Sequence, residues 1–405
     1  MAPPDLSRLL FGASEVISEE DLVRKLERGR PLRVKLGLDP TAPHVTLGWA
    51  VVLRKLRQFQ DVGHTAVLIV GDFTARVGDP SGKSETRPRL SAEAVRANAD
   101  RVLGQFGRIL SEERLEIRYN SEWLERMSME DVLRLTASYT VARMLERDDF
   151  ALRYREQRPI SIMEFLYPLL QAMDSVAVEA DIELGGHDQL FNLLVGRHLQ
   201  REYEQEPQVV LTMPLLIGLD GTRAMGQSLG NYVGIEEPPD QMFGKLMSIP
   251  DHLIVQYLTL CTDLPPDEIR AAEAGLAGGS RHPAEEKRRM AREVVSLYHG
   301  REAARDAEEA FNRVHRDREL PEEVPAVPLP AEALRNGKVS LPHLLFGLGL
   351  ADSNSHARRL IEGRGIQLDG KILEGVDLEV DPGLLIGRVL SRGRRKFVRI
   401  LPPQG

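Results

Sequence analysis

The apolar positions of the first 235 residues form short strand-like runs separated by helical patterns. The strand-like runs at 32–38, 67–70 and 209–213 are each followed by a glycine, an aspartate or a proline. Between these runs lie patterns with apolar residues at helical spacing, among them residues 49–62 and 91–111. Strands that alternate with helices predict a parallel sheet that is covered on both faces. Ligands bind such sheets at the carboxyl ends of the strands, and the polar clusters follow the runs.

Beyond residue 240 the pattern changes twice. Residues 241–318 are rich in Ala, Glu and Arg and predict a helical domain. Four prolines within 319–331 indicate that residues 319–337 form an extended spacer. Residues 338–405 predict a small α+β domain. They carry 11 Lys and Arg against 7 Asp and Glu, a local charge of +4 in a chain whose net charge is −8.

Composition narrows the class of protein. A chain of 405 residues with 42% hydrophobic and 28% charged residues is typical of a globular protein of several domains. Its single cysteine, Cys261, excludes an internal disulfide and a cysteine-based zinc site, so no metal ligand is predicted. No apolar run reaches the length of a membrane span, and the first 30 residues lack the pattern of a signal peptide. We therefore expect a cytoplasmic protein.

The strongest candidate site runs from Tyr167 to Gln189. Tyr167, Gln171 and Asp174 are spaced i, i+4 and i+7, so they share one face of a helix. A carboxylate and an amide on a face that also carries Leu and Met indicate a pocket wall, because an unpaired buried carboxylate is costly. Gly185 and Gly186 then allow a ligand to approach the backbone closely. The alternative is a polar helix face followed by a glycine turn.

A second cluster of turn residues follows the run at 67–70. It comprises residues 71–74 and 78–83, and Arg87 comes shortly after. Lys83 and Arg87 could reach phosphate groups from this loop, although the spacing is not that of a P-loop. Without other motifs, a solvated turn is the better explanation of this cluster.

Several motifs occur here in the order found in bacterial tyrosyl-tRNA synthetases. They are VKLGLDPT at 34–41, GDPSGK at 78–83, YPLLQAMD at 167–174, GGHDQ at 185–189, MPLL at 213–216 and SLGN at 228–231. Residues 353–370 resemble an S4 RNA-binding domain. The chain thus resembles this class I synthetase family over residues 15–400.

The resemblance implies a Rossmann-type, doubly wound α/β catalytic domain at 1–240, a helical anticodon-binding-type domain, and an S4-like domain. It also implies roles for individual residues. Tyrosine would be bound by Asp39, Thr74, Asp79, Tyr167, Gln171, Asp174 and Gln189. ATP, used with Mg²⁺, would be bound by Gly37, Gly48, Gly186, Asp188, Met225 and Ser228. RNA would be bound by Arg358, Arg359, Arg364, Arg394, Arg395 and Lys396.

Both ATP signatures of the family differ in this chain. The H-x-G-H motif of class I synthetases is replaced by Thr46-Leu47-Gly48-Trp49. The K-M-S-K-S motif is replaced by Ala224-Met225-Gly226-Gln227-Ser228. The catalytic positions are therefore Thr46, Trp49 and Gln227, with Lys83 and Arg87 as the remaining cations. Because preorganised donors stabilise the charge that develops on the phosphates, their loss predicts a strongly impaired activation step.

Three functions stay open at this point. The first is a tyrosine–tRNA ligase with weakened adenylation. The second is a paralogue that binds tyrosine or an analogue, and also RNA, as a sensor or regulator. The third is an enzyme that transfers an aminoacyl group or forms an amide without making its own adenylate. The resemblance also implies tRNA as a partner and a homodimer, formed through helices near residues 128–150.

Overall fold

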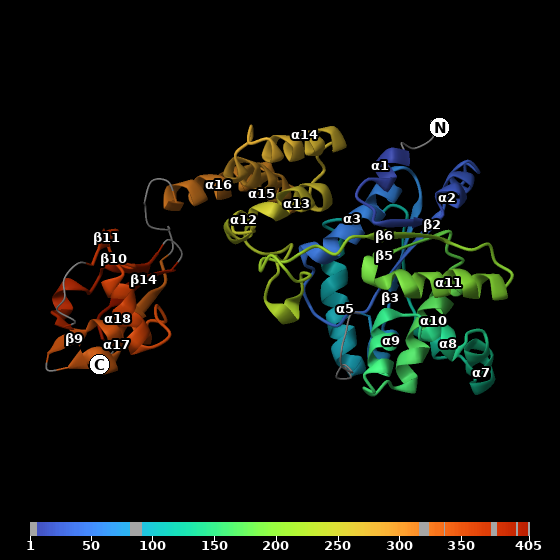
Figure 1. The fold of residues 1–405 in the computed structure, drawn as a ribbon, viewed down its shortest axis with the longest axis horizontal. Helices are drawn as coiled ribbons and strands as arrows, with labels where there is room; N and C mark the ends of the chain where they lie inside the picture. Colours follow the sequence, from blue (N-terminus) through green and yellow to red (C-terminus); the bar gives the residue numbers. More distant parts are fainter. Residues whose placement is uncertain are drawn as a thin grey trace. The chain divides into compact units, whose positions relative to one another are not determined.

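The computed structural model describes residues 6–81, 91–315, 324–335, 337–373, 379–393 and 396–403. The chain divides into two compact units, Met1–Ala304 and Arg305–Gly405. Each unit has its own core, so each is described by itself. Unit 1 carries the sheet predicted from the alternating pattern, and unit 2 carries the smaller C-terminal fold (Figure 1).

Six strands of unit 1 form one sheet in the order β1-β6-β5-β2-β3-β4 within the described residues. The strands are β1 (Glu15–Ile17), β2 (Arg33–Leu38), β3 (Thr65–Val70), β4 (Leu115–Tyr119), β5 (Ile182–Gly186) and β6 (Val209–Met213). Strands β2 to β6 are parallel, and β1 pairs antiparallel with β6 at one edge. The chain adds β3 and β4 on one side of β2, and later adds β5 and β6 on the other. This doubly wound order confirms the predicted α/β class and places a topological switch point between β2 and β5.

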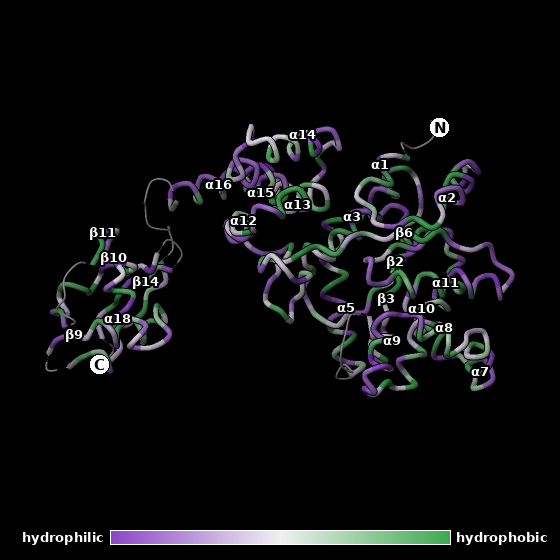
Figure 2. The backbone as a smooth tube through the Cα atoms, in the orientation of Figure 1, coloured by the Kyte–Doolittle hydropathy of each residue, from purple (hydrophilic) through white to green (hydrophobic). Residues whose placement is uncertain are grey.

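Helices cover both faces of this sheet. Helix α3 (Leu47–Asp61) packs on β2, β3 and β5, whereas α11 (Leu190–Glu202) packs on β5 and β6. Because parallel crossovers are right-handed and the two halves wind in opposite directions, α3 and α11 lie on opposite faces. Helix α10 (Ile162–Ala177) packs against α11 and completes the second layer (Figure 1). Figure 2 shows the apolar residues gathered along the strands between these layers.

The remaining helices of the first half are short or amphipathic. They are α1 (Leu6–Leu10), α2 (Glu19–Leu26), α4 (Thr74–Val77), α5 (Ala92–Phe106), α6 (Ser121–Leu124), α7 (Met129–Ala137), α8 (Val141–Met144) and α9 (Asp148–Arg155). Helix α5 begins after Ser91, whose hydroxyl accepts a hydrogen bond from Ala94 N, as expected of a serine N-cap. The pattern at 91–111 predicts a longer helix, but the chain leaves it after Phe106. No helix in the described part of the chain is long and apolar enough to cross a membrane.

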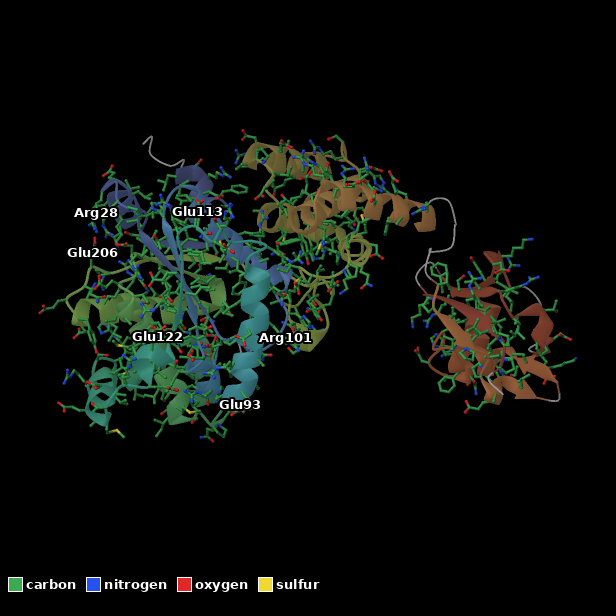
Figure 3. The ribbon with its side chains drawn as sticks, turned by 180° about the vertical axis from the view of Figure 1, so that it is seen from behind. Arg28, Glu93, Arg101, Glu113, Glu122 and Glu206 are labelled. Carbon is green, nitrogen blue, oxygen red and sulfur yellow. The ribbon has the colours of Figure 1, made fainter. Side chains whose placement is uncertain are left out.

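Helix α2 is joined to the loops before β5 and β6 by an ion pair and a hydrogen bond. Arg28, just after α2, makes a two-pronged contact with Glu206 in the loop before β6, at 2.6 and 2.8 Å (Figure 3). Lys25, only 1% exposed, donates to the backbone oxygen of Asp181 at 3.1 Å. These contacts hold β1 at the edge of the sheet beside β6.

The region from residue 239 is helical, as predicted. It consists of α12 (Pro239–Met247), α13 (Ile254–Cys261), α14 (Pro266–Ala277), α15 (Pro283–His299) and α16 (Arg301–His315). Helix α15 begins directly after its N-cap His282. Helix α13 packs on α3, so α12 to α15 belong to the same compact unit as the sheet, whereas the boundary between the two units falls within α16.

Unit 2 contains two small sheets packed on a pair of helices. The elements are β7 (Ala326–Pro328), β8 (Leu334–Arg335), β9 (Lys338–Ser340), β10 (Ile366–Leu368), β11 (Lys371–Ile372), β12 (Glu379–Val380), β13 (Val389–Arg392), β14 (Lys396–Leu401), α17 (Leu341–Gly347) and α18 (Asn354–Glu362). Part of the expected spacer at 319–337 belongs to this fold. Strand β7 pairs parallel with β14, and Leu329 and Ala333 are buried in the core of the unit. The prolines are compatible with this outcome because β7 is an edge strand.

Candidate active site

Polar side chains meet at the carboxyl ends of the parallel strands. Asp39 directly follows β2, Thr74 lies after β3, Asn120 directly follows β4, and Gln189 lies just after β5. All four strands run in the same direction, so these residues gather at one edge of the sheet, beside the switch point. The predicted convergence of the turn clusters is therefore seen.

Asp39 is held by two hydroxyl groups. Thr74 Oγ1 donates to Asp39 Oδ1 at 2.7 Å, and the Tyr167 hydroxyl donates to Oδ2 at 2.9 Å. Gly71 makes this approach possible, since a Cβ there would lie 2.0 Å from Asp39 Oδ1. Burial raises the pKa of Asp39 to about 7, and the nearby Asp79 carboxylate adds to the rise. Burial also keeps the Tyr167 pKa well above its usual value, so this hydroxyl stays protonated.

Asp174 lies deeper, on the same helix as Tyr167, and is 3% exposed. Trp123 Nε1 donates to Asp174 Oδ1 at 2.9 Å, and Asn120 Nδ2 donates to Oδ2 at 3.3 Å. Burial raises the pKa of Asp174 to about 7, although these donors and the charge of Lys35 act in the opposite direction. Trp123 and Asn120 were not singled out from the sequence. The position of Asn120 directly after a strand was the available signal for it.

A chain of amides joins the other predicted tyrosine-site residues. Gln189 Nε2 donates to Asp79 Oδ2 at 2.9 Å. Asn192 Nδ2 lies 3.1 Å from both Gln189 Oε1 and Gln171 Oε1. Asn120 Nδ2 also donates to Thr74 Oγ1 at 2.9 Å, which links the Asp39 and Asp174 groups. The hydrogen bonds thus form two networks, one around Asp39 and Asp174 and one around Asn192, and helix α10 contributes residues to both. Asn192 was not among the predicted site residues.

A buried ion pair lies at the base of this region. Lys35 on β2 and Glu183 on β5 are direct register partners, are 0% and 1% exposed, and approach to 2.9 Å. Lys35 Nζ also donates to Ser175 Oγ at 2.8 Å and to the Gln171 backbone oxygen at 3.0 Å. A second amide, Gln208, donates to Glu183. A buried charge pair with several hydrogen bonds fixes the relative position of the groups around it. The lysine within an otherwise apolar run was the signal in the sequence.

The two altered signature segments lie against each other. Thr46 is the N-cap of α3, and its Oγ1 accepts a hydrogen bond from Trp49 N at 3.5 Å. Gln227 Nε2 donates to the His44 backbone oxygen at 2.6 Å. A Cβ at Gly48 would lie 3.5 Å from the Met225 Cβ. The segment around Met225 therefore covers the start of α3, and Gln227 fastens it there.

The predicted ATP-site glycines differ in how closely other atoms approach them. A Cβ at Gly37 would meet no atom within 4 Å, whereas one at Gly186 would lie 2.6 Å from Asp188 Oδ1. Ser228 is exposed in the short helix η2 (Gln227–Leu229). The side chains at the start of α3 suit phosphates poorly, because Thr46, Trp49 and Gln227 are all uncharged.

Two predicted cations, Lys83 and Arg87, lie outside the described residues. Among the residues that are described, no group of three or more His, Cys, Asp or Glu side chains is arranged to hold a metal ion.

The predicted RNA-binding residues lie in unit 2. Arg358 and Arg359 are exposed on α18, whose N-cap is Ser353. Arg364 follows this helix and is exposed. Lys396 begins β14 and donates to the Gly349 backbone oxygen at 3.3 Å. Arg394 and Arg395 lie outside the described residues. This geometry keeps the described basic residues on the surface of the unit.

Comparisons with known proteins agree with this geometry. The family model for class I tRNA synthetases of the tryptophan and tyrosine type matches residues 27–316. The chain therefore belongs to the class I aminoacyl-tRNA synthetases. A tyrosine–tRNA ligase of Moorella thermoacetica is 51% identical over 393 residues, 96% of this chain and 94% of the relative. A tyrosine–tRNA ligase of Thermotoga maritima is 50% identical over 99% of this chain and 98% of its own length. Within its class, the chain belongs to the tyrosyl-tRNA synthetase family.

Solved structures support the fold. A tyrosyl-tRNA synthetase from Archaeoglobus fulgidus, complexed with L-tyrosine, superposes with a TM-score of 0.61 at 23% identity. The superposition covers 75% of this chain and 98% of that one. A C-terminally truncated mitochondrial enzyme from Coccidioides posadasii gives a TM-score of 0.59 at 24% identity, covering 75% of this chain and 90% of that chain.

Proposed function

We propose that this protein binds L-tyrosine at the strand-end site and charges tRNA with it, through an adenylation step that is strongly slowed. The position of Asp39, Tyr167, Asp174 and Gln189 at the carboxyl ends of the strands and on the helix beside them supports the first part. The uncharged residues at both signature segments support the second. Relatives at about 50% identity are tyrosine–tRNA ligases, which favours this reaction over an unrelated one.

The phenol of tyrosine would reach Asp174. The carboxylate already accepts one hydrogen bond at each oxygen, from Trp123 and from Asn120, and each oxygen has a further lone pair for a ligand hydroxyl. Phenylalanine would leave that lone pair unpaired in a dry site. Tyrosyl-tRNA synthetases are themselves the well-known example of this effect, with a discrimination against phenylalanine of about 10⁵.

The amino group of tyrosine would lie near Asp39, Asp79 and the side-chain amide oxygens of Gln171 and Gln189. An ammonium group is attracted to this acidic end and donates hydrogen bonds to it. Because burial raises the pKa of Asp39 to about 7, the pairing is strongest when Asp39 is ionised.

ATP supplies the α-phosphate that the tyrosine carboxylate attacks in this family. The chain's own residues would have to stabilise the charge that develops on the phosphates. Losing one preorganised donor typically costs about 2.7–4 kcal/mol. Four altered positions act as a unit, so their effects do not simply add. A combined loss of about 5 kcal/mol makes the step several thousandfold slower. Gln227 cannot supply the lost charge, and its amide is engaged by His44.

Tyrosine-dependent exchange between ATP and pyrophosphate tests the proposed reaction. We expect exchange at least a thousandfold below that of an intact relative, together with calorimetric binding of tyrosine. Exchange at an ordinary rate would show that Lys83, Arg87 or other residues compensate. Equal binding of tyrosine and phenylalanine would overturn the assignment of Asp174.

The alternative is a paralogue that binds tyrosine or an analogue without making an adenylate. The altered signatures favour it, because they leave the tyrosine pocket intact while removing phosphate-facing charge. Binding of tyrosine with no exchange above background would support this alternative, as a sensor, a regulator or an aminoacyl-transferring enzyme.

We also propose a homodimer and RNA binding. Apolar side chains near residues 128–150 are highly exposed, including Met129 at 74%, Leu133 at 63% and Val141 at 62%. A group of exposed apolar residues marks a protein interface. The exposed Arg358 and Arg359 lie within residues 338–405, whose local charge of +4 favours contact with a phosphate backbone.

A further inference from the structure

Two adjoining cavities lie beside the middle and end of α3, away from the start of this helix where the signature segment lies. The larger has a volume of about 360 Å³ and the smaller about 200 Å³. Arg8, Arg54, Gln58 and Asp263 line both, so the two share a wall. The larger volume falls within the range of about 300–1,000 Å³ that is usual for small-molecule pockets.

The walls of these cavities are strongly basic. Five cations line them against two carboxylates, Asp61 and Asp263, which gives a net charge of +3. The cations are Arg8, Arg54, Lys55, Arg57 and Arg108. The whole chain has a net charge of −8, so this concave surface stands apart from the rest. A concave surface of one sign concentrates ligands of the opposite sign.

Lys55 contributes a charge that no carboxylate of the described residues neutralises through an ion pair. The side chain is 2% exposed, and its ammonium group donates to Leu9 O at 2.9 Å, Phe11 O at 3.0 Å and Gln58 Oε1 at 2.7 Å. All three acceptors are neutral. Burial lowers the pKa of Lys55 to about 8, and the charges of Arg54 and Arg8 add to the effect.

The arginines around Lys55 keep capacity for a ligand. Arg54 pairs with Asp263 at 2.5 Å, and Arg57 pairs with Asp61 at 2.7 Å through its Nε. A guanidinium has five N–H donors, so one ion pair leaves others available. Tyr298 also lines the smaller cavity, and burial raises the pKa of its hydroxyl well above the usual value, so this group stays a hydrogen-bond donor.

The larger cavity adds an apolar wall. Phe11, Leu260, Leu264, Pro265 and Met213 line it together with the basic residues. A pocket with an apolar wall and a few convergent polar groups suits a small organic ligand. The wall comes from the end of β6, the segment after α1, the end of α13 and the segment between α13 and α14, all within unit 1.

We propose that these cavities form a binding site for a small organic phosphate, separate from the tyrosine site. The phosphoryl group would lie where the two cavities adjoin, against Arg8 and Arg54 of the shared wall and Arg57 of the smaller cavity. The compact apolar body would occupy the larger cavity beside Phe11. Arginine suits this role because its planar fork binds phosphate oxygens in pairs. Binding of the phosphate ligand here does not depend on the activation of tyrosine at the strand-end site.

Calorimetry with phenyl phosphate and inorganic phosphate, at low ionic strength, tests this site on the full-length protein. The test variant is Arg8→Gln with Arg57→Gln, because both side chains are at least partly exposed and their loss should not disturb folding. The matched control is Arg270→Gln with Arg305→Gln, which removes the same charge from exposed positions on α14 and α16. Thermal melting checks that both variants are folded.

We expect wild type and control to bind phenyl phosphate equally, and the test variant to bind it at least tenfold more weakly. We also expect phenyl phosphate to bind more tightly than inorganic phosphate, because only phenyl phosphate can use the apolar wall. No binding by the wild type, or equal binding by test and control variants, overturns the proposal. Equal affinity for the two probes overturns the role of the apolar wall.

Discussion

Replacing Asp39 with asparagine should make the folded protein less sensitive to pH. Burial raises the pKa of Asp39 from its ordinary value of 3.8 to about 7. Between these values the folded state keeps a proton that the unfolded state has lost. Stability is therefore full below about pH 4 and falls as the pH rises toward 7. One pKa unit corresponds to about 1.36 kcal/mol, so Asp39 alone lowers stability by about 2 kcal/mol between pH 5 and pH 7.

Asparagine removes this loss without disturbing the local hydrogen bonds. Thr74 and Tyr167 contact Asp39 through hydroxyl groups, and a hydroxyl can either donate to an amide oxygen or accept from an amide nitrogen. The Asp39→Asn variant should thus retain about 2 kcal/mol more of its pH 5 stability at pH 7 than the wild type does. Asp174 titrates in the same range, so some pH dependence should remain in the variant.

Urea unfolding at pH 5 and pH 7, followed by tryptophan fluorescence, measures this effect. Both tryptophans, Trp49 and Trp123, lie in unit 1, so the signal reports the unit that contains Asp39. Asp267→Asn is the control, because this aspartate is 90% exposed on α14. If wild type and Asp39→Asn lose the same stability between the two pH values, the carboxyl group of Asp39 is not desolvated as the structure implies.

Other predictions test the site and the two units. Trp123→Phe keeps an aromatic ring but removes the donor to Asp174, and should weaken tyrosine binding about tenfold by calorimetry; unchanged affinity would exclude Trp123 from the pocket. Tyrosine affinity should rise between pH 6 and pH 8 as Asp39 ionises, and a flat profile would argue against its pairing with the ammonium group. The four substitutions Thr46→His, Trp49→His, Ala224→Lys and Gln227→Lys together restore the family's side chains and should raise pyrophosphate exchange at least a hundredfold. No gain would mean that other changes disable the site. A chain ending at residue 315 should lose tRNA binding in gel shifts and keep its tyrosine affinity, whereas full retention of tRNA binding would remove unit 2 from that role.

The sequence was a good guide to the central strands and to the strand-end residues. Runs of largely apolar residues marked β2, β3 and β6, because these strands are largely buried between the helical layers. Strand β4 was harder to recognise, since Leu115–Tyr119 alternates apolar and charged residues and is only partly buried. The short β1 owes its place to pairing with β6, which no local pattern encodes.

The candidate site was predictable where spacing along one element decides the geometry. Tyr167, Gln171 and Asp174 share a helix, so their common face followed from their spacing. Trp123 and Asn192 could not be found this way, because they reach the site from other elements. For a similar reason, the sequence did not show that part of the expected spacer belongs to the C-terminal fold. Strand β7 forms only by pairing with β14, which lies far along the chain.

The buried pair between Lys35 and Glu183 constrains how this protein can change over time. Replacing one partner alone would leave an uncompensated charge in a dry interior, which typically costs about 3–5 kcal/mol. Replacing both at once with apolar residues of similar size could be nearly neutral. Among related sequences, we therefore expect a substitution at position 35 to be accompanied by a substitution at position 183. The signature segments can change without this constraint, whereas only matched changes at positions 35 and 183 preserve the stability of the fold beneath the pocket.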